Sequence, residues 1–321
     1  MIKLRIKFYP QFMKKIFFIF LVLAFFVSCF AQKRKVWIDA DTGNEMDDLY
    51  AIARILMDTS VEVTGISSAQ FNNVELVTEK MWHIYPTKNI NTVMISQGLN
   101  ERLLEYLNKM NIPHPLGASK MVGHAWGEMD PRDSPAARFM IKKAHECKPG
   151  EKLDIISIGA VTNLTSAIIL DSSIVPKIRC YLLAAKFYPA NNVWDKNEFN
   201  VRNDLNAFDY ILNKENLELF IMPANIAHPL QFSRSDCKIK LSIAGNKLFN
   251  LLLKRWDEID AGQTWVMWDL ALVEAYLLPG SAINETKYPP LENKKREIYV
   301  YAIINEKQMV ADFWSVLLKS K

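Results

Sequence analysis

The stretch that decides the fold is Val36-Trp37-Ile38-Asp39-Ala40-Asp41-Thr42-Gly43-Asn44-Glu45-Met46-Asp47-Asp48. It begins as an apolar run typical of a buried strand, and apolar residues then recur with helical spacing from Leu49 to Leu56. Five carboxylates in ten residues lie where the strand stops and the helix starts. Such close like charges raise one another's pKa values unless a cation offsets them. The stretch therefore predicts a cation site or an acid/base site, and oxygen ligands of this kind suit Ca²⁺, with Mg²⁺ as the alternative.

The last two acids of the stretch also have a simpler interpretation. Without any ligand, Asp47 and Asp48 would stabilise the dipole of the predicted helix by about 0.3–1 kcal/mol from its first turn. Asp39 and Asp41 do not fit that role, because they stand at the carboxyl end of a strand, where open α/β sheets bind their ligands. Gly43 then allows a sharp turn. Together these features favour a site.

Strand-like and helix-like segments alternate along the rest of the chain, with no repeat and no Gly/Ser-rich linker. The alternation predicts a single α/β domain over residues 32–321, with an open, largely parallel mixed sheet flanked by helices. Near the carboxyl end, the runs 297–304 and 308–313 flank Asn305-Glu306-Lys307 and predict a hairpin added to the sheet. The other expected strands are residues 36–38, 61–66, 92–95, 154–158, 179–183 and 217–222.

The amino terminus predicts export. Five basic residues precede an uncharged apolar run over residues 16–27 and then Ser28-Cys29-Phe30-Ala31, which is the pattern of a secretory signal peptide. The apolar run is shorter than the roughly 20 residues of a membrane-spanning helix. Cleavage after Ala31 would release a soluble periplasmic protein. Cleavage before Cys29, after a signal of residues 1–28, would give a bacterial lipoprotein anchored to the outer membrane through Cys29, and the sequence leaves both outcomes open.

The charge of the chain argues against one class of partner. Removing residues 1–31 takes away five basic and no acidic residues, which changes the formal net charge from +4 to −1. No Lys/Arg stripe with interleaved aromatic residues remains, so we expect no nucleic-acid partner. Cys147, Cys180 and Cys237 are then odd in number, and their spacing resembles neither a disulfide framework nor a zinc site.

The acidic stretch resembles the DxDxGxDD metal-binding signature of nucleoside hydrolases of the inosine-uridine type. Three further segments follow in the order of that family. Residues 158–164 resemble its GPLTN segment, Asn192 with Glu198-Phe199-Asn200 resembles its Asn…EFN pattern, and Trp268-Asp269-Leu270-Ala271 stands where it has its last ligand Asp. The resemblance spans essentially the whole mature chain and implies the nucleoside hydrolase fold, with a Rossmann-like core.

The resemblance implies an activity, a cofactor and a set of site residues. The activity is hydrolysis of the N-glycosidic bond of a ribonucleoside to free base and ribose, in a homodimer or homotetramer. Asp41 would be the general base, Asp39 would support it from behind, and Ca²⁺ would be bound by Asp41, Asp48, Asp269 and the carbonyl of Thr162. The residues expected to hold the ribose hydroxyls are Asp47, Asn192, Glu198, Asn200 and Asp269, with Asn72 or Asn73 as a further candidate.

Two departures from the family pattern bear on the site. Five residues separate Asp41 from Asp47 where the signature has three, which leaves open whether Glu45 replaces or supplements one of the ligands. Trp268 stands where many members have a His that protonates the leaving base. Tryptophan cannot do that, but stacking contributes about 0.5–1.5 kcal/mol beyond burial and favours purine ribonucleosides. The expected second faces of such a stack are Trp126 and Trp194, and the expected fallback acid is His124.

Two other functions remain as alternatives. Asp39-Ala40-Asp41-Thr42 also matches the DxDxT motif of haloacid-dehalogenase-type phosphatases, in which Asp39 would be phosphorylated and Asp41 would act as acid/base. That family does not predict the Asp47-Asp48 pair. The other alternative is an exported ribose- or nucleoside-binding protein that kept its cation and lost turnover, because no acid replaces the missing His.

Overall fold

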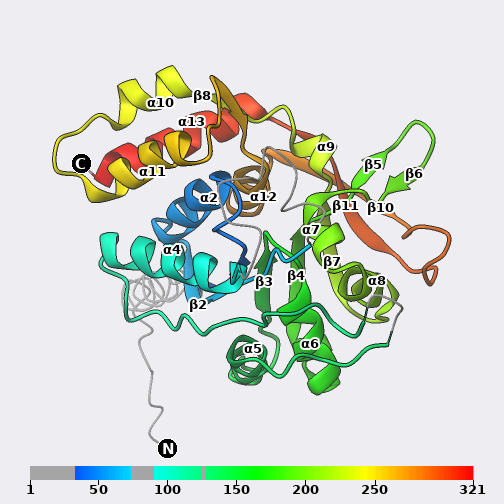
Figure 1. Ribbon diagram of the computed structural model, residues 1–321. Coiled ribbons are helices and arrows are strands. Elements are labelled where there is room, and N and C mark those ends of the chain that lie inside the picture. Colours follow the sequence, from blue (N-terminus) through cyan, green and yellow to red (C-terminus); the bar gives the residue numbers. More distant parts are fainter. Residues whose placement is uncertain (1–32, 74–89, 125–127, 321) are drawn as a thin grey trace, which may run out of the picture. The chain divides into compact units, whose positions relative to one another are not determined.

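A seven-stranded sheet lies at the centre of the fold, in the order β10-β11-β7-β4-β3-β1-β2 (Figure 1). Neighbouring strands are parallel, except for the antiparallel pair β10–β11 at one edge. The predicted class, an open, mixed and largely parallel sheet, is confirmed. The strands are β1 (Arg34–Ala40), β2 (Val61–Ser68), β3 (Leu153–Ser157), β4 (Ile178–Leu183), β7 (Glu218–Met222), β10 (Ala282–Lys287) and β11 (Ile298–Ile304).

The computed structural model describes residues 33–73, 90–124 and 128–320. The chain from Arg34 onward forms one compact unit. The predicted signal segment, with Cys29 and both cleavage sites, lies outside the described residues. Within the described ranges, no helix combines the length and the apolar character needed to cross a membrane.

Both faces of the central strands are buried, because their residues alternate between two hydrophobic clusters. Val36 and Ile38 of β1 belong to one cluster, and Trp37 between them belongs to the other. This explains why the central strands read as continuous apolar runs rather than as alternating ones. Short antiparallel pairs lie outside the sheet: β5 (Lys186–Tyr188) with β6 (Val193–Asp195), and β8 (Gln231–Ser233) with β9 (Thr264–Val266).

The helices divide between the two faces (Figure 1). On the first face are α2 (Asp47–Leu56), α4 (Thr92–Tyr106), α10 (Arg234–Leu241), α11 (Lys247–Glu258), α12 (Trp268–Leu277) and α13 (Glu306–Leu317). On the second face are α5 (Pro135–His145), α6 (Thr162–Leu170), the 3₁₀ helix Ser172–Lys177 and α8 (Leu205–Asn213). The remaining short elements are α7 (Phe199–Asn203), α9 (Ala224–Ala227) and the 3₁₀ helix Leu318–Ser320.

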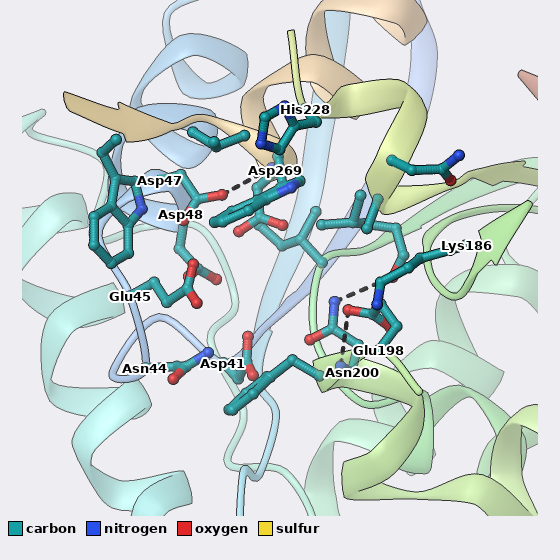
Figure 2. Close-up of a pocket in the computed structure, with 18 of the residues that line it drawn as sticks. Asp41, Asn44, Glu45, Asp47, Asp48, Lys186, Glu198, Asn200, His228 and Asp269 are labelled. Atoms are coloured by element: carbon teal, nitrogen blue, oxygen red, sulfur yellow. Dashed lines mark hydrogen bonds between the residues drawn. The ribbon is translucent and has the colours of Figure 1, made fainter. Parts of the chain in front are cut away.

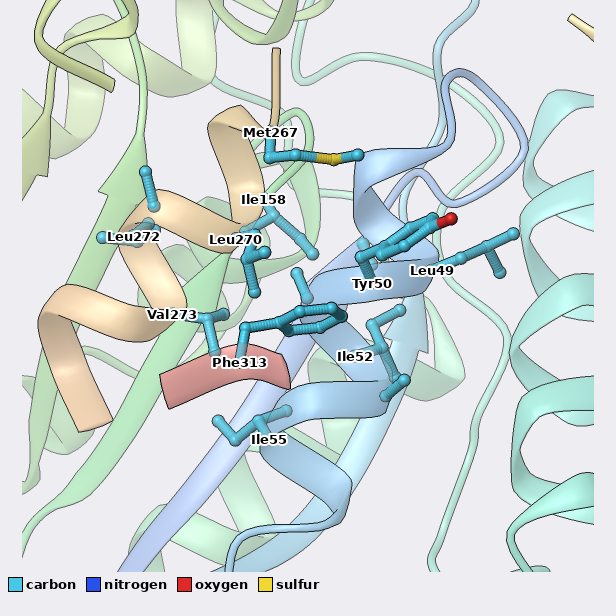
Figure 3. Close-up of a cluster of buried hydrophobic side chains, with 14 of the residues drawn as sticks. Leu49, Tyr50, Ile52, Ile55, Ile158, Met267, Leu270, Leu272, Val273 and Phe313 are labelled. Carbon is cyan, nitrogen blue, oxygen red and sulfur yellow. The ribbon is translucent and has the colours of Figure 1, made fainter. Parts of the chain in front are cut away.

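Helices α2 and α12 pack side by side, and this packing places their first turns together. All ten residues of α2 are buried. Tyr50 and Ile52 of α2 belong to the same hydrophobic cluster as Leu270 and Val273 of α12, and Phe313 of α13 lies between the two helices (Figure 3). Each buried Leu or Ile side chain contributes about 1.5–3 kcal/mol. Because both helices begin at the same edge of the sheet, the acids in their first turns meet there.

Two predicted strands are helices. Residues 92–95 form the first turn of α4, because the side chain of Asn91 accepts the Met94 N–H and caps the helix. Residues 308–313 lie inside α13, where Asn305 caps by accepting the Gln308 N–H. The predicted hairpin is therefore wrong. The antiparallel partner of β11 is β10, which precedes it in the chain.

Candidate functional site

A cavity of about 700 Å³ opens at the carboxyl edge of the sheet. It lies beyond the ends of β1 and β4, and the loops that leave these strands supply much of its lining, as expected for an open α/β sheet. Its acidic lining residues are Asp41, Glu45, Asp47, Asp48, Glu198 and Asp269 (Figure 2). Its aromatic lining, a name used below for the ring-bearing residues, consists of Tyr188, Phe199, His228, Trp265 and Trp268.

The acids at the start of α2 and α12 form the carboxylate cluster, defined here as Asp41, Glu45, Asp47, Asp48 and Asp269. The amide N–H of Asp269 donates to Oδ2 of Asp47 over 3.0 Å and joins the two helices (Figure 2). Asp47, Asp48 and Asp269 can each place one carboxylate oxygen within 4.8 Å of the other two. A single cation could therefore contact all three.

Burial raises the pKa of every member of this cluster, and repulsion between carboxylates adds to this at all members except Asp47. Burial, followed by the charge of Asp48, raises the pKa of Asp41 well above its ordinary value. Burial raises the pKa of Asp47 to about 6, although the Asp269 amide favours the ionised form. Burial and then the charge of Asp47 raise the pKa of Asp269. A bound cation would offset these effects and favour the ionised forms of the carboxylates.

Unpartnered oxygens in the cluster fit a bound cation. Asp41 Oδ2, Asp47 Oδ1 and Asp48 Oδ1 are buried and accept no hydrogen bond. A buried carboxylate oxygen without a partner costs free energy, and a cation would recover that cost. The donor set consists of oxygen atoms, which is the set that Ca²⁺ and Mg²⁺ prefer. The residues present therefore suit a hard divalent cation.

Asp39 lies behind the cluster rather than in the cavity. Its Oδ1 accepts hydrogen bonds from Ser67 Oγ over 2.6 Å and from Asn163 Nδ2 over 2.9 Å. Burial raises its pKa to about 7. This placement agrees with the supporting position expected from the sequence, because its contacts hold the end of β1 just before Asp41.

Glu198 and Asn200 reach the cavity from α7. Glu198 caps that helix, and its carboxylate accepts the N–H groups of Asn200 at 3.0 Å, Val201 at 3.1 Å and Ala185 at 3.2 Å. Burial raises its pKa to about 7 against these hydrogen bonds. Asn200 is fixed in turn, since its Nδ2 donates to the Leu183 carbonyl over 3.1 Å. Both side chains are thus held in place before any ligand binds.

Three expected site residues do not line the cavity. Asn192 is exposed in the β5–β6 turn and lines a separate cavity of about 460 Å³. Asn72 is engaged elsewhere, because its Nδ2 donates to the Ser119 carbonyl and its Oδ1 accepts from Thr92. Thr162 is buried at the start of α6, with its hydroxyl donating to Asp204. The expected cation contact of the Thr162 carbonyl stays a prediction. Asn73, the alternative to Asn72, donates from Nδ2 to the Arg202 carbonyl.

The aromatic lining differs from the one expected. Trp268 lines the cavity, but its neighbour there is Trp265, whose ring lies at 83° to it with centroids 6.4 Å apart. A base stacked on one ring would therefore meet the edge of the other. Trp194 packs on Phe187 and lines the separate cavity, and Trp126 lies outside the described residues.

The histidine in the cavity is His228, not His124. His124 is exposed and pairs with Glu128 over 3.2 Å, away from the cavity lining. His228 follows α9. Strand β8, shortly after it, pairs with β9, and the Met267 N–H donates to the Leu230 carbonyl. These contacts bring the segment of His228 beside Trp268, and both residues line the cavity. The only sequence signal for His228 was its position shortly after a predicted strand. No motif marked it or Trp265.

The chain belongs to the inosine-uridine preferring nucleoside hydrolase family, whose model matches residues 36–318. This membership confirms the resemblance seen in the four motifs. It does not support the haloacid-dehalogenase alternative, which shares only the Asp39-to-Thr42 pattern.

Two plant proteins are similar to part of the chain. They are the probable uridine nucleosidase 2 of Oryza sativa subsp. japonica, 24% identical over 219 residues, and uridine nucleosidase 1 of Arabidopsis thaliana, 26% identical over 209 residues. Each alignment covers 64% of this chain and 60% of the relative.

Solved structures extend the similarity to most of the fold. An inosine-guanosine nucleoside hydrolase superposes with a TM-score of 0.69 at 14% identity, over 89% of this chain and 98% of that one. A purine-preferring ribonucleoside hydrolase from Gardnerella vaginalis superposes with a TM-score of 0.65 at 15% identity, over the same shares. At such identities the likeness shows the fold, and it confirms the predicted nucleoside hydrolase fold.

Proposed function

We propose that the protein hydrolyses the N-glycosidic bond of ribonucleosides to free base and ribose, with Ca²⁺ as cofactor and purine nucleosides as preferred substrates. The observation that carries the proposal is the pairing of two kinds of lining in one cavity. The carboxylate cluster has unpartnered buried oxygens, and the aromatic lining includes two tryptophans and a histidine. A cation and a sugar suit the first lining, and a flat heteroaromatic base suits the second.

The carboxylates suit the charge that develops during the reaction. Breaking the bond between C1′ and the base nitrogen leaves a sugar with oxocarbenium character, which nearby negative charge stabilises. A bound divalent cation, held by Asp41, Asp48, Asp269 and the Thr162 carbonyl, would supply the charge that orders a water molecule and lowers its pKa. Asp41 would accept the proton of that water as it attacks C1′.

The ribose hydroxyls have fixed partners in the proposal. Asp47 and Asp269 lie beside each other at the starts of α2 and α12, and Glu198 and Asn200 are held by their own hydrogen bonds. Groups that are already positioned lose little entropy when the sugar binds, so binding energy can distort the ring toward the transition state.

His228 would protonate the leaving base. As the C1′–N bond breaks, its electron pair goes to the base nitrogen, and an imidazolium can supply the proton that this nitrogen then takes. His228 lines the cavity beside the segment of Trp268 and is open to solvent, from which it can regain a proton. His228 would thereby replace the proton donor that many family members have where this chain has Trp268.

Base preference would follow from the aromatic lining. Trp268 and Trp265 offer one ring face and one ring edge, and the larger ring system of a purine covers more of both surfaces than a pyrimidine does. This argument supports the purine preference, whereas the two plant relatives carry the name uridine nucleosidase. The preference for purine over pyrimidine nucleosides is therefore the most specific part of the proposal.

The test is release of base and ribose from inosine, adenosine, guanosine, uridine and cytidine by the purified mature protein. We expect hydrolysis of all purine nucleosides at a higher kcat/KM than of the pyrimidine nucleosides. Faster release of uracil than of hypoxanthine would remove the purine preference. Nucleoside binding without release of ribose would instead favour the binding-protein alternative, and phosphate release from a phosphate monoester would contradict the reaction class.

Export is a separate part of the proposal and rests on residues 1–31 alone. Mass spectrometry of the protein from a membrane fraction and from a soluble periplasmic fraction would distinguish the two cleavage sites. A diacylglycerol-modified amino-terminal Cys29 would establish the lipoprotein, and a terminus at Gln32 would establish the soluble form. An intact Met1 in all fractions would contradict export.

A further inference from the structure

The loop that follows Asp41, two residues longer than the family signature, is fastened by one buried arginine. Arg255 of α11 is 3% exposed. Its Nη2 donates to the Gly43 carbonyl over 2.7 Å and to the Asn44 carbonyl over 3.4 Å, and its Nε donates to the Glu45 carbonyl over 3.1 Å. One guanidinium thus holds three consecutive carbonyls, which its planar fork allows and a lysine would not.

Helix α4 fastens the opposite side of the same loop. The Thr42 hydroxyl donates to Asn100 Oδ1 over 2.5 Å, and the Gly43 N–H donates to Ser96 Oγ over 3.4 Å. A Cβ atom at Gly43 would lie 2.6 Å from a methyl carbon of Ile95, so only glycine fits there. The loop is thus fixed between α4 and α11 rather than free to adapt.

The consequence of this fixing is the position of Glu45. Its side chain is 8% exposed, lines the cavity and lies among the other carboxylates (Figure 2). The carboxylates of Asp41, Asp47 and Asp48 line the same cavity and carry the same charge (Figure 2). A buried carboxylate among three others is unfavourable in a purely structural role. A cation in the cavity would reverse that balance.

We infer that Glu45 supplies a further carboxylate to the cation site and that Arg255 is the positioning residue that aims it there. The inference rests on the proposed cation site and extends it to a residue outside the family signature. An added oxygen ligand favours Ca²⁺, which accepts six to eight oxygens in flexible geometry, over Mg²⁺, which demands a near-ideal octahedron. The longer loop thereby makes the site selective for the larger cation.

Arg255 also places a positive charge behind the cluster. Arg255 is buried and does not itself line the cavity. Its other ionic partner is Glu258, 3.2 Å from Nη1 on the same helix. Removing Glu258 would leave the three contacts to the loop in place, and Glu258→Gln is therefore the matched control.

The test is calorimetric titration of the metal-free full-length mature protein with CaCl₂ and with MgCl₂. We expect Glu45→Gln to weaken Ca²⁺ binding by about tenfold or more and to weaken Mg²⁺ binding less, because Mg²⁺ needs fewer ligands. Arg255→Lys should weaken Ca²⁺ binding by about 10–100-fold, as expected when the support of a ligand is lost. Glu258→Gln should bind both ions like the wild type.

The double variant Glu45→Gln/Arg255→Lys separates positioning from general structural support. If Arg255 acts through Glu45, adding Arg255→Lys to Glu45→Gln causes little further loss of Ca²⁺ affinity. Additive losses would overturn the positioning role, and wild-type Ca²⁺ affinity in Glu45→Gln would overturn the ligand role. A wild-type protein that binds neither ion would contradict the proposed function itself, which is a distinguishable result.

Discussion

The carboxylate cluster and the aromatic lining share one cavity but are built differently. Four of the five acids of the cluster lie within Asp41–Asp48, and the fifth follows at the start of α12. The aromatic residues come from separate segments after β4, β7 and β8. Asp47 is 2% exposed, whereas Tyr188 is 44% exposed. One region is thus compact and enclosed, and the other is assembled from short strands and helix ends that lie far apart in the chain.

This difference separates the residues that act on the sugar from those that face the base. Enclosed carboxylates on the first turns of two packed helices have few ways to move, which suits the reacting sugar and its cation. Rings on short elements outside the central sheet can be exchanged without disturbing the core, which suits the selection of a base. We therefore expect substitutions in the cluster to abolish turnover, and substitutions of the tryptophans in the aromatic lining to change which nucleoside is preferred. His228 is the member of the aromatic lining that takes part in the reaction.

The largest effect is expected for Asp41→Asn. The change keeps the volume of the side chain but removes both the proton acceptor and a cation ligand, so kcat should fall by about 10²–10⁴-fold or more. The fold should survive, because removing one of several buried like charges relieves repulsion. Steady-state kinetics and thermal melting without metal check both statements, and Asp130→Asn, at an exposed site, is the control. Wild-type turnover in Asp41→Asn would remove the mechanism.

A smaller loss is expected for His228→Ala. Without a proton donor for the leaving base, kcat should fall by about 10²-fold, at the lower end of general acid catalysis. KM should change little, because binding of the ribose does not depend on this side chain. His124→Ala is the control, because His124 lies outside the cavity, and its kcat should stay at the wild-type value. Equal rates for the two variants would mean that the aromatic lining takes no part in the chemistry.

Base preference should change with Trp268→Ala. Loss of a stacking surface costs about 0.5–1.5 kcal/mol beyond the lost burial, which corresponds to about a threefold to tenfold rise in KM. The rise should be larger for inosine than for uridine, while kcat for either changes less. Trp194→Ala provides a control of the same size in the separate cavity. A uniform loss for all nucleosides would show that Trp268 only supports the fold.

The smallest effect is expected for Asn192→Ala. Sequence resemblance assigns this residue to the ribose, but the structure places it in the exposed β5–β6 turn. We expect kcat/KM to stay within about twofold of wild type. The free energy of unfolding should also change little, because substitutions at exposed positions usually alter it by less than about 0.5 kcal/mol. Asn200→Ala is the positive comparison. A tenfold loss in Asn192→Ala would show that the β5–β6 turn closes over the bound sugar.

The two regions also differ in how many of their residues could be predicted from the sequence. Most of the cluster was predictable because four of its five acids lie within Asp41–Asp48 and follow a strand, so charge density and topology agree. Trp265 and His228 were missed because segments far apart in the chain form the aromatic lining, and no local pattern connects them. Arg255 was missed for a related reason. An arginine within a helix is usually exposed, and the hydrogen bonds of Arg255 to the loop carbonyls cannot be seen in the local sequence.

The strand predictions were likewise correct where the local sequence determines the structure and wrong where contacts with other segments do. The central strands were predicted correctly, since burial on both faces makes each of them a continuous apolar run. The errors at residues 92–95 and 308–313 arose because apolar and β-branched residues resemble a short strand. In the structure, the capping side chains of Asn91 and Asn305 start helices at these places, and packing of the following turns completes them.

The central claim is that the carboxylate cluster holds a divalent cation that the reaction requires. The most direct test is to strip the protein with a chelator and to follow ribose release from inosine while CaCl₂ is added back. We predict no turnover in chelator and saturable recovery with Ca²⁺. Full turnover in the presence of excess chelator would contradict the account.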